Sequence, residues 1–361
     1  LSDAAEALRV AAEVGYPVLL KAAAGGGGKG VRVGRGGGEI ERAFEAAGNE
    51  AQAAFGDRSV YIEKFLEGPR HIEIQLLADR HGNTLHLGER ECSIQRRHQK
   101  LIEEAPSAVL TPEERAAMGA TAVAAAQAVN YEGAGTVEFL YQDGRFYFLE
   151  MNTRIQVEHP VTELVTGIDL VQWQIRVAAG EALPFRQEDI GWTGHAIECR
   201  ITSEDPANGF LPSTGRIQML EVPTGPGVRW DGGITPGYEV GLFYDPMLAK
   251  LIVHGPTREQ AIERMKRALT ELRIVGVDTS VPFHLRVMAE PDFRAGRLDI
   301  KYLDKHEAEL LDGAQDEERI RIAALAAALL EEESRARRTA QRAQPGAAAG
   351  GGSRWRGRSW R

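Results

Sequence analysis

The sequence has few cysteines and no long hydrophobic run. Its only cysteines are Cys92 and Cys199, too few for a disulfide framework, which fits a reducing compartment. We expect both to be small buried residues rather than nucleophiles. No apolar stretch is long enough to span a bilayer, and the first residues have no signal-peptide pattern, so we expect no secretion signal. We therefore expect a cytoplasmic protein with no membrane partner.

The charge balance excludes another class of partner. The 361 residues include 43 Lys and Arg and 52 Asp and Glu, giving a net charge of −9. A surface of this sign repels phosphate backbones, so we expect no nucleic-acid partner. The length is sufficient for two or three domains.

The most distinctive polar pattern runs from Glu150 to Glu158. If this run is an extended strand, its alternate side chains point to opposite faces. One face then carries two carboxylates, two amides and a guanidinium, from Glu150, Asn152, Arg154, Gln156 and Glu158. The pattern predicts an active-site strand, since so many polar groups on one strand need partners. A strand with one solvated polar face is the alternative.

A second carboxylate, Glu138, lies on a preceding predicted strand, residues 136–141. The intervening segment 142–145 contains Asp143-Gly144, a hairpin turn signal. A strict two-residue loop would place Glu138 and Glu150 on opposite faces, whereas an odd loop or a bulge would place them side by side. Adjacent carboxylates with a neighbouring amide suit Mg²⁺. Two separate surface salt bridges are the alternative.

A glycine-rich segment, residues 25–30, connects two predicted strands, residues 18–21 and 31–33. Such a segment allows backbone N–H groups to approach an anion closely. It is no Walker A loop, because it lacks the closing Lys-Ser/Thr and precedes a strand. We expect a hairpin tip that covers a triphosphate, with Lys21 near the phosphates. Taken alone, the segment could equally be a flexible loop.

Three further segments carry polar groups suited to a nucleotide. Residues 60–66 are predicted to be a strand, and residues 70–77 alternate strictly, with Ile72, Ile74 and Leu76 inward. The run from Glu89 to Lys100 mixes acidic and basic side chains. On its own, that run is also compatible with a solvated charged loop.

The sequence contains eight motifs, in the order GYPVLLKA, GGGGKG, YIEKFLEGPRHIEIQ, ERECSIQRRHQKLIEEAPS, GTVEF, FLEMNTRIQVEHPVTE, GHAIECRI and FLPSTGRI. They resemble, in the same order, those of biotin carboxylase. This family is the ATP-grasp component of biotin-dependent acyl-CoA carboxylases. The resemblance covers residues from about 15 to 310. It implies an α+β ATP-grasp fold, with a glycine-tipped small lobe and an antiparallel-sheet main lobe, followed by a mostly β C-terminal domain. It also implies that ATP and Mg²⁺ (or Mn²⁺) activate bicarbonate as carboxyphosphate, which then carboxylates biotin.

The resemblance assigns a nucleotide role to positions that match the family's motifs. Lys21, Gly27 and Gly28 would contact phosphates. Glu63, Lys64, His71 and the backbone of Leu66 would hold adenine and ribose, and Gln95 and His98 would line the same site. Glu138 and Glu150 would meet the ATP phosphates through metal ions, with Asn152 as a third metal ligand.

Other matching positions would carry the chemistry. Lys100 would face phosphate and bicarbonate. Arg154, Gln156 and the backbone of Val157 would position bicarbonate, and Glu158 would be the general base that deprotonates it. Arg200 would stabilise the biotin enolate oxygen. Residues 194–200 alternate, so Arg200 shares a face with Glu198, and a structural pair between them is the alternative.

The domain boundaries that we expect are 1–66 for the small lobe, 67–182 for the main lobe and 183–310 for the C-terminal domain. We expect residues 311–361 to form a helical segment followed by an Ala/Gly/Arg-rich linker. Helices are expected at Asp3 to Val14, with Asp3 and Glu6 as a capping box, and from Thr111, with Pro112 and Glu114 completing the box. Two more are expected over residues 168–179, with Asp169 in the first turn, and 257–272.

The resemblance also implies parts that this sequence lacks. The chain begins at Leu1, so we expect it to be a fragment without the family's N-terminal domain and upstream ATP-binding lysine. No biotin-acceptor tetrapeptide is present, which implies a separate or downstream biotinyl carrier domain, together with a carboxyltransferase and a homodimeric full-length protein. A non-catalytic nucleotide-binding fragment is the alternative function, and the same module of pyruvate or urea carboxylase remains open.

Overall fold

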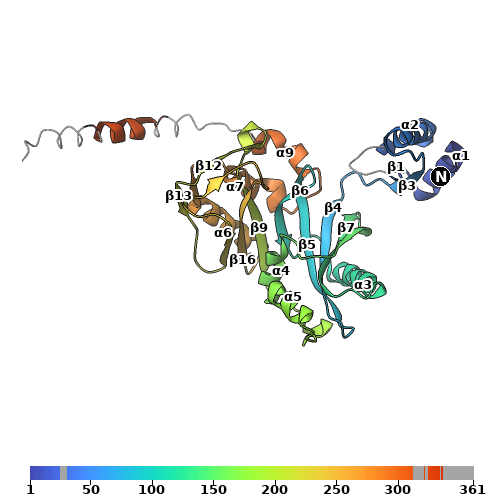
Figure 1. Cartoon of the computed structure of the whole chain (residues 1–361), viewed down its shortest axis with the longest axis horizontal. Coiled ribbons are helices and arrows are strands. Elements are labelled where there is room, and N and C mark those ends of the chain that lie inside the picture. Colours follow the sequence, from blue (N-terminus) through green and yellow to red (C-terminus); the bar gives the residue numbers. More distant parts are fainter. Residues whose placement is uncertain (25–30, 312–320, 322–323, 334, 336–361) are drawn as a thin grey trace, which may run out of the picture. The chain divides into compact units, whose positions relative to one another are not determined.

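The computed structural model describes residues 1–24, 31–311, 321, 324–333 and 335. The first residues form a small three-stranded sheet, in which β1 (Val18–Ala22) lies between β2 (Val31–Gly34) and β3 (Val60–Lys64), antiparallel to both. Helices α1 (Ala4–Val14) and α2 (Gly37–Phe55) pack on it through a shared apolar cluster (Figure 1). The strands flanking the glycine-rich tip are as predicted, but residues 25–30, with Gly27 and Gly28, lie outside the described residues.

Capping explains where α1 begins. The Asp3 side chain accepts a hydrogen bond from the backbone N–H of Glu6, as predicted. The Glu6 carboxylate accepts from the backbone and hydroxyl of Ser2 instead of returning a bond to Asp3. Only half of the predicted capping box therefore forms.

An eight-stranded antiparallel sheet forms the centre of the remaining fold, in the order β14-β16-β9-β6-β5-β4-β7-β8 (Figure 1). Its strands are β4 (Arg70–Ala78), β5 (Thr84–Arg96), β6 (Gln99–Ala105), β7 (Gly133–Gln142), β8 (Arg145–Asn152), β9 (His195–Thr202), β14 (Val228–Gly232) and β16 (Met247–Gly255). The run from Glu89 to Lys100 thus belongs mainly to β5 and β6, and the solvated-loop interpretation is wrong.

The two faces of β4 are buried for different reasons. Ile72, Ile74 and Leu76 pack against α3 (Pro112–Ala128), which begins with the complete capping box predicted at Thr111. The alternate side chains, including Glu73, point to the opposite face and are also buried. Polar groups buried in this way require hydrogen-bond partners, and that face is where the candidate site lies.

Helices α4 (His159–Thr166) and α5 (Leu170–Ala178) follow β8. Asp169 is the N-cap of α5, accepting from the N–H of Gln172, and so lies just before the first turn rather than in it. Leu170, Trp173 and Val177 of α5 pack with residues from β4 and β5.

The C-terminal part surrounds a second large apolar cluster, which contains Cys199 and Leu251 from the sheet and Met265 from α6 (Arg258–Glu271). Both cysteines are buried and free, as expected. The boundary at residue 182 remains a prediction: β9 pairs with β6, so the large sheet includes strands from both sides of it. The other elements are η1 (Gln187–Asp189), β10 (Glu204–Asp205), η2 (Pro206–Asn208), β11 (Leu211–Pro212), β12 (Gly215–Arg216), β13 (Met219–Glu221), β15 (Glu239–Val240), β17 (Arg273–Val275), α7 (Val281–Ala289), α8 (Pro291–Arg294) and α9 (Tyr302–Leu311).

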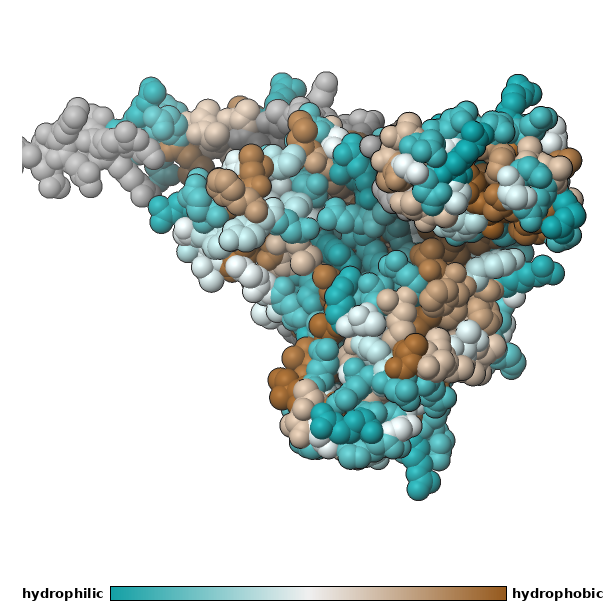
Figure 2. Space-filling view, turned by 45° about the vertical axis from the view of Figure 1, so that its right-hand side comes forward, coloured by the Kyte–Doolittle hydropathy of each residue, from teal (hydrophilic) through white to brown (hydrophobic). Residues whose placement is uncertain are grey.

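The chain divides into two compact units, Leu1–Leu311 and Asp312–Arg361. In the second unit, described residues 324–333 are helical as predicted, whereas the Ala/Gly/Arg-rich linker lies outside the described residues. Among the described residues, no helix has the length and apolar character needed to cross a membrane. On the face drawn in Figure 2, apolar residues lie in separate patches among hydrophilic ones.

Candidate active site

A cavity of 250 Å³ collects polar side chains from five strands of the large sheet and from the segment after β8. Apart from Gln99, all of its lining residues are site residues predicted from the sequence. They are His71, His98, Gln99, Lys100, Glu138, Glu150, Asn152, Arg154, Gln156, Val157, Glu158 and Arg200.

Lys100 connects three carboxylates within this cavity. Its Nζ donates to Glu158 at 2.5 Å, to Glu73 at 2.6 Å and to Glu138 at 3.1 Å. Burial alone would lower the pKa of Lys100, but the surrounding carboxylates raise it above its ordinary value. The ammonium therefore stays charged and holds the carboxylates close together, which would otherwise repel one another.

The β7–β8 hairpin places Glu138 and Glu150 side by side. Its loop is the two-residue Asp143-Gly144 turn, with both residues at positive φ and Gln142 paired with Arg145. A bulge then shifts the register, so that Glu138 pairs with Glu150. The sequence left open whether an odd loop or a bulge would place the two carboxylates side by side, and the structure has the bulge.

The acceptors around this pair suit a divalent cation. Glu138 Oε1 lies 3.1 Å and Glu150 Oε1 3.4 Å from Nδ2 of Asn152. Two carboxylates and an amide are the hard donors that Mg²⁺ prefers. Lys100 and the nearby His71, at 3.2 Å from Glu138, lower the pKa of Glu138 against the effect of burial, so its oxygens are available as anionic ligands. The residues present therefore fit the predicted metal.

The predicted strand from Glu150 to Glu158 is wrong beyond Asn152, where β8 ends. Residues 153–158 form an irregular segment, and Glu158 is the N-cap residue of α4, with Pro160 in its first turn. The polar side chains of Arg154, Gln156 and Glu158 still line the cavity, but they do so from an irregular segment and not as alternate residues of one strand face. Gln156 Nε2 donates to Glu138 at 2.8 Å, and Arg154 donates to Asn152 at 3.2 Å.

Arg200 on β9 extends toward Glu158. Its Nε donates to Glu103 at 2.6 Å and its Nη2 to Glu158 Oε2 at 3.0 Å. The structure thus favours the predicted cleft orientation over a structural pair with Glu198. Burial raises the pKa of Glu103 despite its bond to Arg200, and it raises the pKa of Glu198 further.

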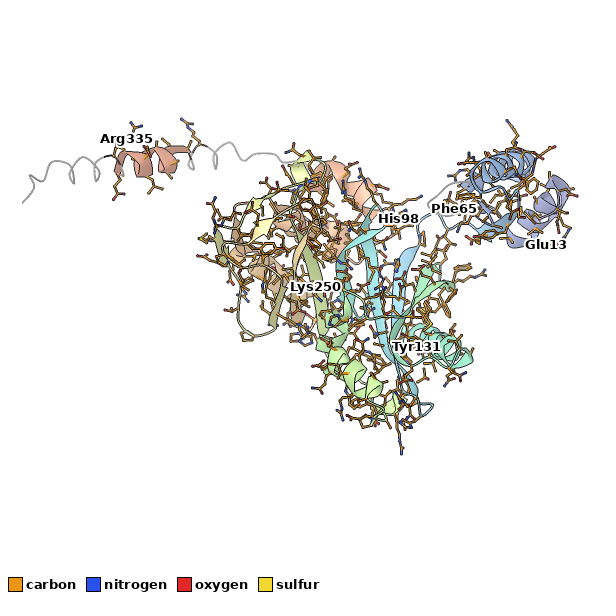
Figure 3. All side chains as sticks on the ribbon, viewed as in Figure 1. Glu13, Phe65, His98, Tyr131, Lys250 and Arg335 are labelled. Carbon is orange, nitrogen blue, oxygen red and sulfur yellow. The ribbon has the colours of Figure 1, made fainter. Side chains whose placement is uncertain are left out.

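The predicted nucleotide residues divide between two regions. His71, Gln95 and His98 lie beside the cavity, with Gln95 Nε2 3.0 Å from His71 Nδ1. His98, marked in Figure 3, follows Arg97 in the turn between β5 and β6, and both residues have positive φ. Burial would lower the pKa of His71, but Glu138 and Glu73 raise it to about 9.

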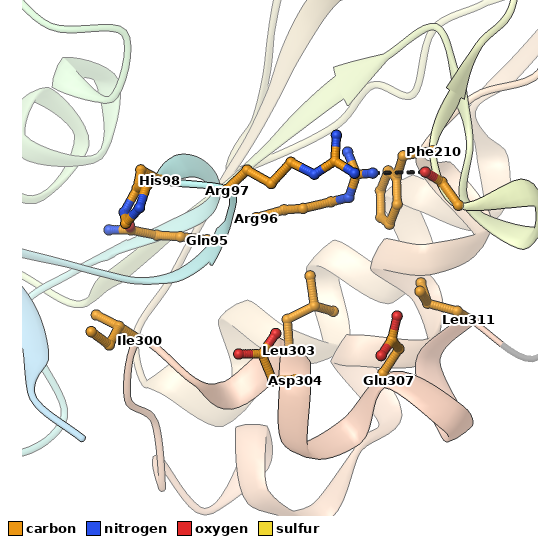
Figure 4. A pocket seen from close by; sticks show the side chains of 11 residues that line it. Gln95, Arg96, Arg97, His98, Phe210, Ile300, Leu303, Asp304, Glu307 and Leu311 are labelled. Atoms are coloured by element: carbon orange, nitrogen blue, oxygen red, sulfur yellow. Dashed lines mark hydrogen bonds between the residues drawn. The ribbon is translucent and has the colours of Figure 1, made fainter. Parts of the chain in front are cut away.

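Gln95 and His98 also border a second cavity, of 500 Å³, shown in Figure 4. Its other end is formed by Arg96, whose guanidinium lies 4.4 Å from the centre of the Phe210 ring and donates to the Gly209 carbonyl. Ile300 supplies apolar surface to the same cavity. An aromatic base or a ribose could contact this combination of polar and apolar side chains.

The remaining nucleotide residues belong to the small sheet or its exit. Lys21 forms an ion pair with Glu63 at 2.5 Å, and Lys64 donates to the carbonyls of Gly15 and Tyr16. Leu66 lines a third cavity together with Lys64. Within the described residues, none of these four side chains lines the cavity around Lys100.

Four residues that support the site were not predicted from the sequence: Glu73, Arg90, Glu103 and Lys250. The sequence does contain a signal for Glu73. It lies between Ile72 and Ile74 in the alternating run, so its side chain is expected on the face opposite theirs. Lys250, marked in Figure 3, donates to the Val157 carbonyl at 2.8 Å. Nothing in the local sequence indicated this contact, since 93 positions separate the two residues.

Comparison with known proteins agrees with this geometry. The family of the carbamoyl-phosphate synthase L chain ATP-binding domain matches residues 1–186, and the biotin carboxylase C-terminal domain matches residues 198–305. A pyruvate carboxylase subunit from Methanothermobacter thermautotrophicus is 57% identical over 85% of this chain and 62% of its own length. Biotin carboxylase 1 of Bacillus subtilis is 53% identical over 85% of this chain and 69% of its own length. The chain thus spans about two thirds of these relatives.

Solved structures give the same result. The biotin carboxylase domain dimer of Hydrogenobacter thermophilus 2-oxoglutarate carboxylase, in complex with MgADP, ADP and bicarbonate, has a TM-score of 0.76. It is 52% identical, with coverage of 87% of this chain and 70% of that one. The biotin carboxylase subunit of pyruvate carboxylase has a TM-score of 0.78 at the same identity and coverage. The chain has the ATP-grasp fold of these proteins and belongs to the biotin carboxylase family.

Proposed function

We propose that this chain carries the site for ATP-dependent carboxylation of biotin by bicarbonate. The observation that carries the proposal is the contact of one carboxylate, Glu158, with both Lys100 and Arg200. A base placed between two cations can meet an anionic substrate without leaving its charge uncompensated. Biotin carboxylase relatives and the bicarbonate complex of a neighbour support the same activity.

In this proposal, Glu158 accepts the hydroxyl proton of bicarbonate. Bicarbonate is a poor nucleophile until that proton leaves, and a carboxylate at hydrogen-bond distance can take it. Arg154, Gln156 and the backbone of Val157 hold the anion. The Lys250 bond to the Val157 carbonyl would fix this backbone.

Lys100 and the metal residues would face the phosphates of ATP. Glu138, Glu150 and Asn152 would hold Mg²⁺, which would offset the charge of the transferring phosphoryl group when bound. Lys100 would stabilise the same charge from the protein side. His71, Gln95 and His98 would contact the nucleoside, with Glu63, Lys64 and Leu66, while Lys21, Gly27 and Gly28 would cover the phosphates.

Arg200 would act in the second step. Removing a proton from the ureido nitrogen of biotin places negative charge on its oxygen, and a nearby guanidinium stabilises that charge. A carrier domain would deliver biotin, and a carboxyltransferase would choose the final acceptor. Relatives named for pyruvate and 2-oxoglutarate carboxylases lie as close as biotin carboxylases, so an acyl-CoA acceptor is one proposal among these. We propose a dimer, as in the neighbouring 2-oxoglutarate carboxylase domain.

The test is Glu158→Gln, which removes the base and keeps its shape. We expect bicarbonate-dependent turnover to be abolished while the Kd for ATP, measured by calorimetry, stays within about 3-fold. An equal loss of ATP affinity would show that Glu158 supports nucleotide binding rather than proton removal.

A further inference from the structure

Arg90 on β5 has no place in the proposed chemistry, yet its bonding partners lie beside the groups that do. Its side chain is fully buried. The guanidinium makes five hydrogen bonds, which is the full number of its N–H donors. The acceptors are Glu73 (2.6 Å), Gln75, Thr162 (3.1 Å), Thr136 (3.2 Å) and Gln156 (3.0 Å).

Two of these acceptors contact the site through their other atoms. Glu73 accepts from Arg90 with Oε1 and from Lys100 with Oε2. Gln156 accepts from Arg90 with Oε1 and donates from Nε2 to Glu138. If the Gln156 amide turned over, its NH₂ would meet the Arg90 donors, so Arg90 fixes which end of the amide faces the cavity.

The two hydroxyl acceptors, on Thr162 and Thr136, connect Arg90 to the elements that carry Glu158 and Glu138. Thr162 lies on α4, whose N-cap is Glu158, and Thr136 lies on β7 two residues before Glu138. One guanidinium therefore connects β7 and the start of α4. The segment 153–158, which has no regular structure, connects β8 to α4, and Arg90 bonds both Gln156 within this segment and Thr162 on that helix.

Burying an arginine side chain carries a large desolvation cost that an apolar side chain of similar size would not have. Replacing a buried ion pair by apolar residues is often neutral or stabilising, whereas removing one partner is costly. A side chain needed only for packing would not require five directed bonds. The geometry points to orientation of the neighbouring polar groups as the reason for Arg90.

We propose that Arg90 is a positioning residue that orients Gln156, Lys100 and the start of α4 for binding and deprotonating bicarbonate. This inference rests on the proposed function. It predicts that loss of the planar fork disturbs the anion site more than nucleotide binding, because Arg90 reaches the phosphate-facing Lys100 only through Glu73 and bonds none of the residues that would hold adenine and ribose.

The test is Arg90→Lys, which keeps the charge but loses the planar fork. We expect kcat/KM for bicarbonate to fall at least about 10-fold, since small misplacements are costly, and KM for ATP to change less than about 2-fold. Amide hydrogen exchange in residues 153–158 should become faster. The matched control is Arg115→Lys, which disturbs a bidentate arginine bond to Glu89 of the same strand but away from the cavity.

Thr162→Val is a milder second variant, because it is nearly isosteric and removes one of the five bonds. It should shift bicarbonate kinetics and exchange in the same direction by a smaller factor. The proposal is overturned if Arg90→Lys and Thr162→Val match Arg115→Lys in both measurements. If the unsubstituted chain shows no bicarbonate-dependent turnover, that result counts against the proposed function, and the exchange comparison alone decides the role of Arg90.

Discussion

Arg200 Nη2 lies 3.0 Å from Glu158 Oε2, although the two residues are 42 positions apart in the sequence. Arg200 comes from β9 and Glu158 from the start of α4, so the contact joins a sheet strand to the helix that follows the metal residues. In the proposed function, this contact places the base for bicarbonate beside the cation for biotin.

Arg200→Lys keeps the charge but cannot bond Glu103 and Glu158 in the same forked geometry. We expect biotin-stimulated ADP release to fall about 100-fold, the usual cost of losing one donor to a developing oxyanion. Bicarbonate-dependent release without biotin should change much less. Arg229→Lys is the control, because Arg229 makes a bidentate bond to Asp231. Equal loss with and without biotin would contradict a specific role in the biotin step.

Lys100→Met should destabilise the fold. The substitution removes the cation shared by Glu73, Glu138 and Glu158, so this buried carboxylate cluster loses one of its positive charges. Removing one partner of a buried ion pair lowers the free energy of unfolding by about 3–5 kcal/mol. Urea unfolding monitored by circular dichroism would measure this loss. An unchanged free energy of unfolding would mean that the carboxylates find another partner.

His284 makes stability depend on acid pH. Burial lowers its pKa to about 4, and its Nε2 lies 2.8 Å from the Arg200 carbonyl. The unfolded chain binds this proton near pH 6.5 and the folded chain only near pH 4, so stability falls as the pH decreases between these values. His284→Gln should therefore remove up to about 3 kcal/mol of the pH dependence in that window.

The measurement is the free energy of unfolding of both proteins at intervals from pH 7 to pH 4. The difference between His284→Gln and the unsubstituted chain should change progressively across this range. Parallel curves would show that His284 does not titrate differently in the folded protein.

Thr111→Ala tests the capping of α3 independently of the site. Thr111 accepts from the N–H of Glu114, and the Glu114 carboxylate accepts from the N–H of Thr111. Losing an N-cap of this kind costs about 1 kcal/mol. Thr121→Ala, inside the same helix, is the control and should cost less, because alanine favours helix. Similar losses in both variants would deny a special role to the cap.

Local patterns predicted most of the secondary structure that supports the site. The alternation of Ile72, Ile74 and Leu76 identified the face of β4 that packs on α3, and Thr111 identified the start of that helix. The Asp143-Gly144 turn predicted the hairpin but left its register open. The register depends on a bulge after Glu138, and nothing in the local sequence indicated where the extra residue would lie.

The segment after Asn152 shows why a pattern can select the right residues for the wrong reason. Arg154, Gln156 and Glu158 continue the alternation of β8, but the chain leaves the strand and starts α4 near Pro160. A proline in a first helical turn was the overlooked signal. Arg90 was missed for another reason: its acceptors are scattered from Glu73 to Thr162, and only the folded chain brings them together.

The most direct test of the central claim is ADP release by this chain, measured with and without bicarbonate and with and without free biotin. We expect release that requires bicarbonate, increases with biotin and disappears in Glu158→Gln. ATP cleavage that is independent of bicarbonate and unaffected by Glu158→Gln would contradict the proposed function.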